Sequence, residues 1–273
     1  MYSYIFTFLS FIFGLIIGSF LNCLVWRLHT KESMLERSKC PKCGKMIAWY
    51  DNIPLLSYIF LLGKCRHCKS HISFQYPAVE LITGLLFAIA LNFEFRPEYS
   101  GLNLNSLLIL KPDYFLIVPL LRDYFLISVM IIVFIYDLRW YLILDIVTLP
   151  AIAVLVILNL FLGFTWQSLL LGALFGGGFF LFQFVVSRGK WIGGGDIRLG
   201  FLMGIALGWP KIITALMLAY IGGSIISIGL LAFRKKNWNS QIPFGIFLSV
   251  ATIATLFWGD FLIKWYLGII GIR

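Results

Sequence analysis

This chain of 273 residues contains eight apolar runs, and they constrain its fold more than any other feature. Hydrophobic residues make up 60% of the chain and charged residues 12%, whereas soluble domains are about a quarter charged. Because a helix needs about 20 apolar residues to cross a bilayer, we predict an all-α integral membrane protein with about eight transmembrane helices. The predicted spans are 4–26, 76–93, 124–136 with its upstream extension, 146–162, 169–187, 199–209, 212–233 and 244–267.

The distribution of basic residues predicts the orientation of these spans. With the N-terminus outside, the inner segments are 27–75, 137–145, 188–198 and 234–241, and they hold 16 of the 22 Lys and Arg residues. Lys and Arg gather in the cytoplasmic loops of membrane proteins, so the asymmetry supports this orientation. Loop charge then accounts for the formal net charge of +10, and we expect the lipid bilayer, and no nucleic acid, as a partner. The first run has no basic residue before it and Arg27 after it. In a secretory signal peptide the basic residues come before the apolar run, so we expect this run to be a retained span.

The segment 27–75 has the polarity of a small soluble domain. We therefore divide the chain into a first transmembrane helix (1–26), a cytosolic insert (27–75) and a polytopic membrane domain (76–273). An insert of this size has too small an apolar core to fold well without further stabilisation.

The insert contains two Cys-x-x-Cys pairs, Cys40-Pro-Lys-Cys43 and Cys65-Arg-His-Cys68. Two such pairs offer four thiolates to one tetrahedral zinc ion, and binding of the metal would stabilise the folded insert. A reducing cytosol argues against disulfides, although four free thiols or two disulfides remain alternatives. We predict a structural, zinc-ribbon-like site. Basic residues crowd the pairs and should favour thiolates: these are Lys39, Lys42, Lys45, Lys64 and Arg66.

Two aspartates lie in sequence that otherwise has the character of a membrane domain. Asp137 ends an apolar run, and Asp196 follows the three glycines 193–195. A carboxylate near the bilayer centre costs about 2.5–3.5 kcal/mol on insertion scales, so such residues are kept mainly where they have a function. Both are predicted at the inner membrane edge, where two carboxylates that share a proton can activate a water molecule, as in aspartyl proteases. We predict Asp137 and Asp196 as a catalytic pair.

The surroundings of the two acids predict that they differ. Consecutive glycines are poor helix formers, so a new helix is expected to begin at Asp196, and its positive end should lower the pKa of that carboxyl. Asp137 ends the preceding helix, at the negative end of its dipole. Asp196 should then ionise more readily than Asp137. The structural alternative is that both acids cap helices or pair with Arg139 and Arg198.

Several ordered motifs between about residues 18 and 200 resemble the type IV prepilin peptidase family, the leader peptidases of pilus and type II secretion systems. Two segments match the catalytic region, Asp137-Leu138 and Gly193-x-Gly-Asp196-Ile-Arg-Leu199. The earlier motifs are Gly18-Ser-Phe-Leu-Asn22 with Arg27-Leu28, Arg37-Ser-Lys-Cys40-Pro-Lys-Cys43, Asn52-Ile-Pro-Leu-Leu-Ser-Tyr58, Gly63-Lys-Cys65-Arg-His-Cys68, Ile72-Ser73 and Tyr76-Pro-Ala-Val-Glu80.

The resemblance implies a bifunctional enzyme of the bacterial inner membrane. Asp137 and Asp196 would be the catalytic aspartates of an endopeptidase that removes the leader of type IV prepilins or pseudopilins on the cytosolic side. The four cysteines would bind the metal. N-methylation of the new terminal residue would use S-adenosylmethionine, with Glu80 the one candidate residue. The chain departs from the family pattern at Leu144, where Pro is common, and at Arg198, which replaces Lys.

Two other classes of protein are compatible with the residues alone. Paired membrane acids also bind cations in transporters and proton channels, although such acids usually lie near the bilayer midplane. A membrane adaptor with a zinc ribbon and no chemistry is the second alternative.

Overall fold

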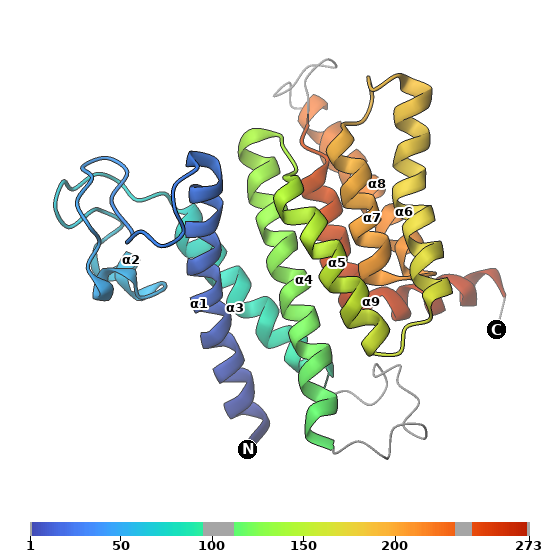
Figure 1. Ribbon diagram of the computed structural model, residues 1–273, viewed down its shortest axis with the longest axis horizontal. Coiled ribbons are helices and arrows are strands. Elements are labelled where there is room, and N and C mark those ends of the chain that lie inside the picture. Colours follow the sequence, from blue (N-terminus) through green and yellow to red (C-terminus); the bar gives the residue numbers. More distant parts are fainter. Residues whose placement is uncertain (1, 95–111, 233–241, 272–273) are drawn as a thin grey trace. The chain divides into compact units, whose positions relative to one another are not determined.

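The computed structural model describes residues 2–94, 112–232 and 242–271, so the predicted inner segment 234–241 lies outside the described residues. Within these ranges the chain is helical without strands, apart from two isolated β-bridges in the insert. It forms two compact units, Met1–Leu102 and Asn103–Arg273, each of which is described by itself below (Figure 1). The division into segments 1–26, 27–75 and 76–273 stays a prediction.

The first unit contains two long helices, α1 (Tyr2–Thr30) and α3 (Gln75–Glu94), which lie side by side. Their backbones approach closely at Gly18, where an added Cβ would lie 2.7 Å from the Cα of Glu80. Gly14 makes the same kind of contact with α3, so both glycines of Gly14-x-x-x-Gly18 allow the two helices to pack closely.

The insert joins these two helices and contains little regular structure. A 3-10 helix, η1 (Trp49–Asn52), precedes a short α-helix, α2 (Leu56–Phe60). The two bridges, Lys39 with Met46 and Lys64 with His71, each close one turn of the chain. Because few of its backbone groups are paired in regular secondary structure, the insert depends on other interactions for its stability.

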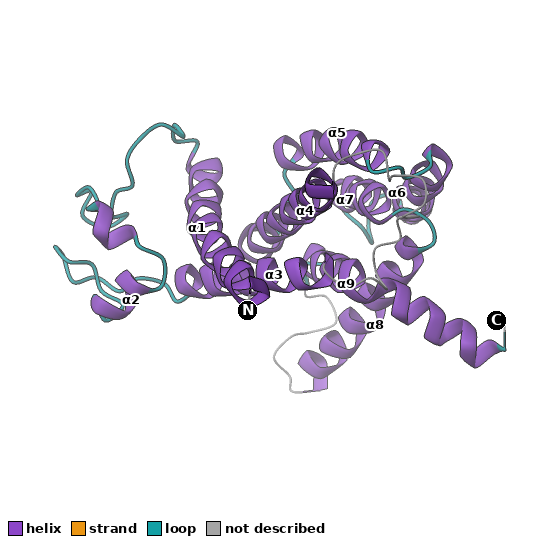
Figure 2. Ribbon diagram, turned by 90° about the horizontal axis from the view of Figure 1, so that it is seen from below, coloured by secondary structure: helices purple, strands orange, loops and turns teal. Residues whose placement is uncertain are grey.

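In the described part of the second unit, six helices form a bundle. Its buried apolar core is formed mainly by α4, α5, α7, α8 and α9, with Phe180 of α6. Figure 2 shows α7 between α5 and α6, and α7 also contacts α8 and α9. The helices are α4 (Pro112–Trp140), α5 (Asp145–Phe161), α6 (Trp166–Ser187), α7 (Gly194–Leu207), α8 (Lys211–Ala232) and α9 (Gly245–Ile270).

Each predicted apolar run overlaps one helix of the described residues. Six helices in the described part of the chain, α1, α3, α4, α6, α8 and α9, are long and apolar enough to cross a membrane. The chain therefore has the character of a multi-pass membrane protein. The count of eight spans is not confirmed, because α5 has 17 residues and α7 has 14. Both are shorter than the ~20 residues that a bilayer requires.

Glycines determine how closely α6 and α7 pack. A Cβ at Gly176 would overlap the carbonyl oxygen of Gly200, and a Cβ at Gly172 would overlap that of Gly204. Gly172 and Gly176 of α6 therefore face Gly204 and Gly200 of α7 at backbone contact. Backbone contact of this kind is how small residues hold membrane helices together.

The C-terminal end of α7 is capped by buried polar side chains. Arg122 of α4 pairs with Asp123 at 2.6 Å, donates from Nε to Asn159 Oδ1 at 3.1 Å, and donates to the carbonyl of Ala206. Asn159 of α5 donates to the carbonyl of Ile205 at 2.6 Å. A cation at the end of a helix satisfies orphan carbonyls and suits the negative end of the dipole. This network accounts for two charged residues inside an otherwise apolar span.

Candidate functional site

Asp196 is the third residue of α7 and caps the start of that helix. Its Oδ2 accepts from the backbone N–H of Gly193 at 3.1 Å, and its own N–H donates to the carbonyl of Gly193 at 3.2 Å. The helix begins at Gly194, so the prediction that it starts at Asp196 is wrong by two residues. Glycine propensity is a weak preference, and this reciprocal capping satisfies groups that the helix start would otherwise leave unpaired.

The glycines of this motif are not equivalent. A Cβ added at Gly195 would lie 2.9 Å from the Cβ of Ile143, whereas a Cβ at Gly194 would meet open space. Ile143 belongs to the short connection between α4 and α5. Gly195 is therefore needed for close approach of α7 to this connection, and Gly194 is not.

Asp137 lies in the last turns of α4 and is only 5% exposed. Its Oδ2 accepts from the backbone N–H of Ile246, in the first turn of α9, at 3.1 Å. A Cβ at Gly245 would lie 2.8 Å from the same oxygen, so a residue without a side chain is required there. Sequence reasoning missed Gly245 and Ile246. The available signal was Pro243 two residues before Gly245, at the start of the last apolar run.

The structure brings the predicted pair together. Ile143 lies against the positions that a Cβ would take at both Gly195 and Gly245. It therefore packs between the start of α7 and the start of α9, which supply the N–H donors to Asp196 and Asp137. Asp137 is close enough to Asp196 for its charge to act on that carboxyl. Both acids are thus held by backbone N–H groups at the start of a helix, and the charge of one disfavours ionisation of the other.

The predicted difference in pKa between Asp196 and Asp137 is not supported by the surroundings of the two acids. Burial raises the pKa of Asp196 to about 6, against the effect of the Gly193 N–H and with a further contribution from the charge of Asp137. The expected lowering is wrong in direction, because loss of water around the carboxylate outweighs the helix dipole. Asp137 in turn has the N-terminus of α9 beside it, which the sequence argument did not include.

The nearby arginines bind other partners. Arg198 forms an ion pair with Asp145, and the guanidinium of Arg139 lies over the ring of Trp140 at 5.7 Å. The structural alternative holds in part: both acids accept hydrogen bonds at helix starts, but neither arginine pairs with them in the described contacts.

One polar residue that sequence reasoning missed lies near Asp196 and is hydrogen-bonded to a second. Tyr220 of α8 is within electrostatic range of that carboxyl, and its hydroxyl is hydrogen-bonded to Gln183 Nε2 of α6 at 2.9 Å. The Tyr220 ring also contacts Phe244, at the start of α9, with ring centres 5.0 Å apart. No local motif marks Tyr220 or Gln183, because the proximity of Tyr220 to Asp196 arises from helix packing.

The four cysteines of the insert form one cluster. Their Sγ atoms all lie within 4.8 Å of one another, and those of Cys40 and Cys68 are 3.9 Å apart. Zinc–sulfur bonds of about 2.3 Å in a tetrahedron place sulfurs about 3.8 Å apart, so this donor set fits zinc. Two similar turns position it: Gly44 donates to Cys40 O at 2.9 Å, and Lys69 donates to Cys65 O at 3.0 Å.

The predicted influence of basic side chains on the thiols is not found at Cys68. Arg66 pairs with Asp51 at 2.6 Å, and Lys39 pairs with two glutamates. A hydrogen bond with the hydroxyl of Ser70, 3.1 Å away, lowers the pKa of Cys68 to about 6. Local hydrogen bonding therefore favours the thiolate at Cys68, because it stabilises the charged form. At Cys43 a backbone hydrogen bond at Lys45 acts in the same direction, but burial and the neighbouring cysteines outweigh it and raise the pKa to about 11.

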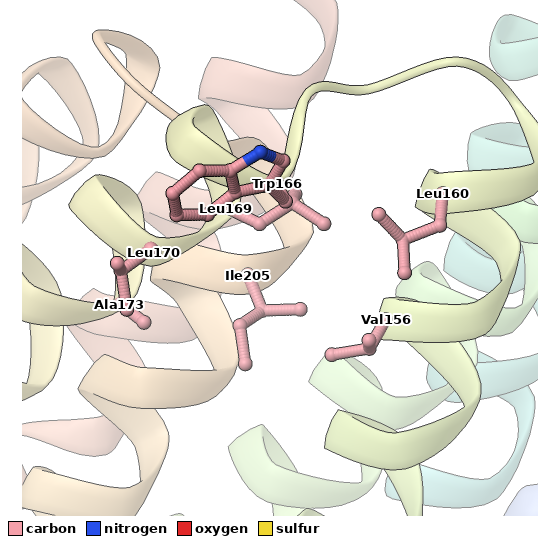
Figure 3. Close-up of a pocket in the computed structure, with 7 residues that line it drawn as sticks. All are labelled: Val156, Leu160, Trp166, Leu169, Leu170, Ala173 and Ile205. Carbon is pink, nitrogen blue, oxygen red and sulfur yellow. The ribbon is translucent and has the colours of Figure 1, made fainter.

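Glu80 has a structural partner in the first unit. It is buried, and its Oε2 accepts from the backbone N–H of Leu55 at 2.8 Å. No residue is assigned to S-adenosylmethionine. A hollow of about 300 Å³ between α5, α6 and α7 carries no titratable side chain (Figure 3). Its lining consists of Val156, Leu160, Trp166, Leu169, Leu170, Ala173 and Ile205.

Comparison with known proteins places the chain in a family. The model of the bacterial peptidase A24 N-terminal domain matches residues 12–93, and that of the type IV leader peptidase family matches residues 124–228. A prepilin leader peptidase/N-methyltransferase of Aeromonas salmonicida strain A449 is 31% identical, over 96% of this chain and 94% of that protein. One of Pseudomonas aeruginosa is 30% identical, over 97% and 94%. No solved structure gives a significant match. The chain belongs to the prepilin leader peptidase/N-methyltransferase family, as its motifs indicated.

Proposed function

We propose that this protein is a membrane-embedded aspartyl endopeptidase that removes the leader from type IV prepilins or pseudopilins, with Asp137 and Asp196 as its catalytic pair. One observation carries the proposal. Two acids 59 positions apart come within electrostatic range of each other, and each is held by a backbone N–H at the start of a helix. The substrate class comes from the names of the relatives.

The mechanism follows from a carboxyl pair that shares one proton. The ionised carboxylate accepts a proton from a water molecule held between the acids, and the resulting hydroxide attacks the carbonyl carbon of the scissile bond. The protonated acid donates its proton to the leaving amine, so the carbon–nitrogen bond breaks and the pair again holds one proton. A pKa of about 6 for Asp196 fits such sharing near neutral pH. The proton belongs to the pair rather than to one residue.

We further propose that cleavage takes place on the cytosolic side of the bacterial inner membrane. The excess of basic residues in the predicted inner segments supports this orientation. A basic leader would then stay in the cytosol while the apolar part of the substrate lies along the helices. The family does not favour the alternative of a cation or proton transporter.

The second activity is methylation of the new N-terminal amine with S-adenosylmethionine, which supplies the methyl group when bound. The support is the name of the relatives, peptidase and N-methyltransferase together. Glu80 remains a candidate by position, although its carboxylate already binds the backbone at Leu55.

The four cysteines would hold a structural zinc ion in the insert. The spacing of their sulfurs supports this role. Four thiolates complete a tetrahedral shell and leave no position for water or substrate, so the metal would stabilise the insert and take no part in hydrolysis.

A cleavage assay with matched variants tests the peptidase. Purified protein in lipid nanodiscs is mixed with a prepilin-like peptide, and the product is followed by mass spectrometry. Asp137→Asn and Asp196→Asn should each lower the cleavage rate by at least about 1,000-fold, because neither can complete the acid–base pair. Asp145→Asn is the control, since this aspartate lies at the start of α5 and pairs with Arg198.

Retained cleavage in both variants, with intact zinc content, would rule out the catalytic pair. The same spectra test methylation in the wild-type protein. With S-adenosylmethionine added, the processed substrate should gain the mass of one methyl group in place of a hydrogen. An unmodified product under those conditions argues that this chain cleaves without methylating.

A further inference from the structure

One apolar stretch of the insert is exposed to an unusual degree. Between Asp51 and Lys64 the chain has no charged residue. Within this stretch Phe60 is 79% exposed and Leu62 is 81% exposed, and Leu56 and Ile59 are at least half exposed. Contiguous exposed apolar side chains usually mark a surface that is covered by something else.

The position of the stretch along the helix pair indicates what covers it. Asn22 of α1 donates to the carbonyl of Tyr76 at 3.1 Å, which marks the level where α3 begins. Glu80 lies one turn further into α3, directly against Gly18 of α1. Four residues of helix correspond to about 6 Å along the axis. The contact between Glu80 and Gly18 is therefore inside the apolar length that the two helices share.

A hydrogen bond ties the apolar stretch to that level. The backbone N–H of Leu55, directly before α2, donates to Glu80 Oε2 at 2.8 Å. The insert thus turns back along the helix pair, and Figure 1 shows α2 beside α1 rather than beyond its end. Since α1 and α3 are both long and apolar enough to span a membrane, a bilayer that they cross would surround them at this level.

We propose that residues 55–62 form a membrane-interface segment, in which Leu56, Ile59, Phe60 and Leu62 insert among the lipid acyl chains. The first three are spaced i, i+3 and i+4, so they share one face of α2. Amphipathic segments that lie in the interface bury their apolar face about 5–10 Å deep, which agrees with the level of Glu80.

The residues around the segment have the chemistry of the headgroup region. Trp49 is 76% exposed and Tyr50 is also exposed, and Trp and Tyr are the residues enriched at membrane–water boundaries. Exposed lysines flank the segment at Lys45 and Lys64. Lysines close to an anionic bilayer surface strengthen binding of an apolar segment.

Leu35 provides a matched control within the same insert. It is 96% exposed, more than Phe60, but Arg27 near the end of α1 donates to the carbonyls of Met34 and Glu36 on either side of it. Leu35 is thus held at the end of the helix pair, outside the apolar length. The two side chains are equally apolar and differ in level.

The test measures depth at both positions in the full-length protein in nanodiscs that contain anionic lipid. A ketone-bearing amino acid replaces Phe60 or Leu35 and is coupled to a nitroxide, so the cysteines stay intact. Collision rates with oxygen, which concentrates in the bilayer, and with a water-soluble nickel chelate are then compared. At position 60 the oxygen-to-nickel ratio should be at least about tenfold higher than at position 35.

Equal ratios at the two positions would overturn the proposal. Protection of position 60 from both reagents would also overturn it, because a second protein copy or a pilin helix would then cover the segment. Glu80→Leu removes the acceptor for Leu55. In this variant the ratio at position 60 should fall toward that at position 35 while zinc content is retained, and an unchanged ratio would show that Glu80 does not set the depth.

Discussion

The cysteine cluster and the aspartate pair are assembled in different ways. The four cysteines lie within 29 consecutive residues, and two short hydrogen-bonded turns place them. The aspartates come from α4 and α7, and their geometry depends on a third helix, α9, and on a connecting residue, Ile143. A local cluster can be organised by a metal ion, whereas the pair requires the whole second unit to be packed. The two sites should therefore respond differently to the same kinds of change.

The largest effect is expected from removal of metal. A chelator that strips zinc should unfold the insert, since structural zinc contributes about 10–16 kcal/mol in small zinc domains. Helices of the second unit should be spared. Limited trypsin digestion should then cut between Lys39 and Lys69, while the near-ultraviolet spectrum of the bundle stays unchanged. If the digestion pattern is the same with and without metal, the cysteines are not a folding site.

The next largest effect is expected from a change in the contact between α6 and α7, the helix that carries Asp196. Gly204→Ala places a Cβ on the backbone of Gly172, and overpacking of this kind costs about 3 kcal/mol. Gly178→Ala is the control, because a Cβ there meets nothing within 4 Å. It should be neutral or slightly stabilising, since Ala is the better helix former.

Thermal unfolding of the bundle, followed in nanodiscs, measures both variants. Zinc content should be normal in each variant, which would show that the change affects the contact between α6 and α7 and not the insert. A Gly204→Ala protein as stable as the Gly178→Ala protein would show that α6 and α7 can separate without cost.

A smaller and more local effect is expected at the start of α7. Gly195→Ala should lower the cleavage rate by about 100-fold with little loss of stability, because its Cβ would push the helix start away from Ile143. Gly194→Ala has open space and should retain activity. The double variant Gly195→Ala with Ile143→Gly removes the Cβ that the new methyl group would meet, so it should recover part of the lost rate in kcat. Failure of that rescue would mean that the contact with Ile143 is not the cause.

The smallest effect concerns the two cysteine turns. Gly44 and Lys69 each follow the second cysteine of a pair and have positive φ, 69° and 57° respectively. A non-glycine residue is strained there, so Lys69→Gly should stabilise the insert by about 0.5–1 kcal/mol. Gly44→Ala should destabilise it by a similar amount. Competition for zinc with a chromophoric chelator compares the zinc affinities of the two variants. Equal changes in affinity in the same direction would contradict the likeness of the two turns.

Much of the helical content and the cysteine cluster follow from local patterns. Apolar runs identified eight helices, although not how many of them cross the membrane. The Cys-x-x-Cys spacing was sufficient because each turn is built from neighbouring residues. The start of α7 was predicted two residues late, since the reciprocal contact of Asp196 with Gly193 overrides the weak propensity of glycine.

The amino-acid sequence by itself determined the membrane character of this protein, its cysteine site and the two acids that stand out against an apolar background. Tertiary structure alone decided how those acids are held. The N–H of Ile246, the contacts of Ile143 with two helix starts, and the Arg122 cap at the end of α7 all join residues far apart in the chain. The physical reason is that burial and helix-end hydrogen bonds depend on which helices pack together, and burial outweighs the dipole that local sequence implies for Asp196.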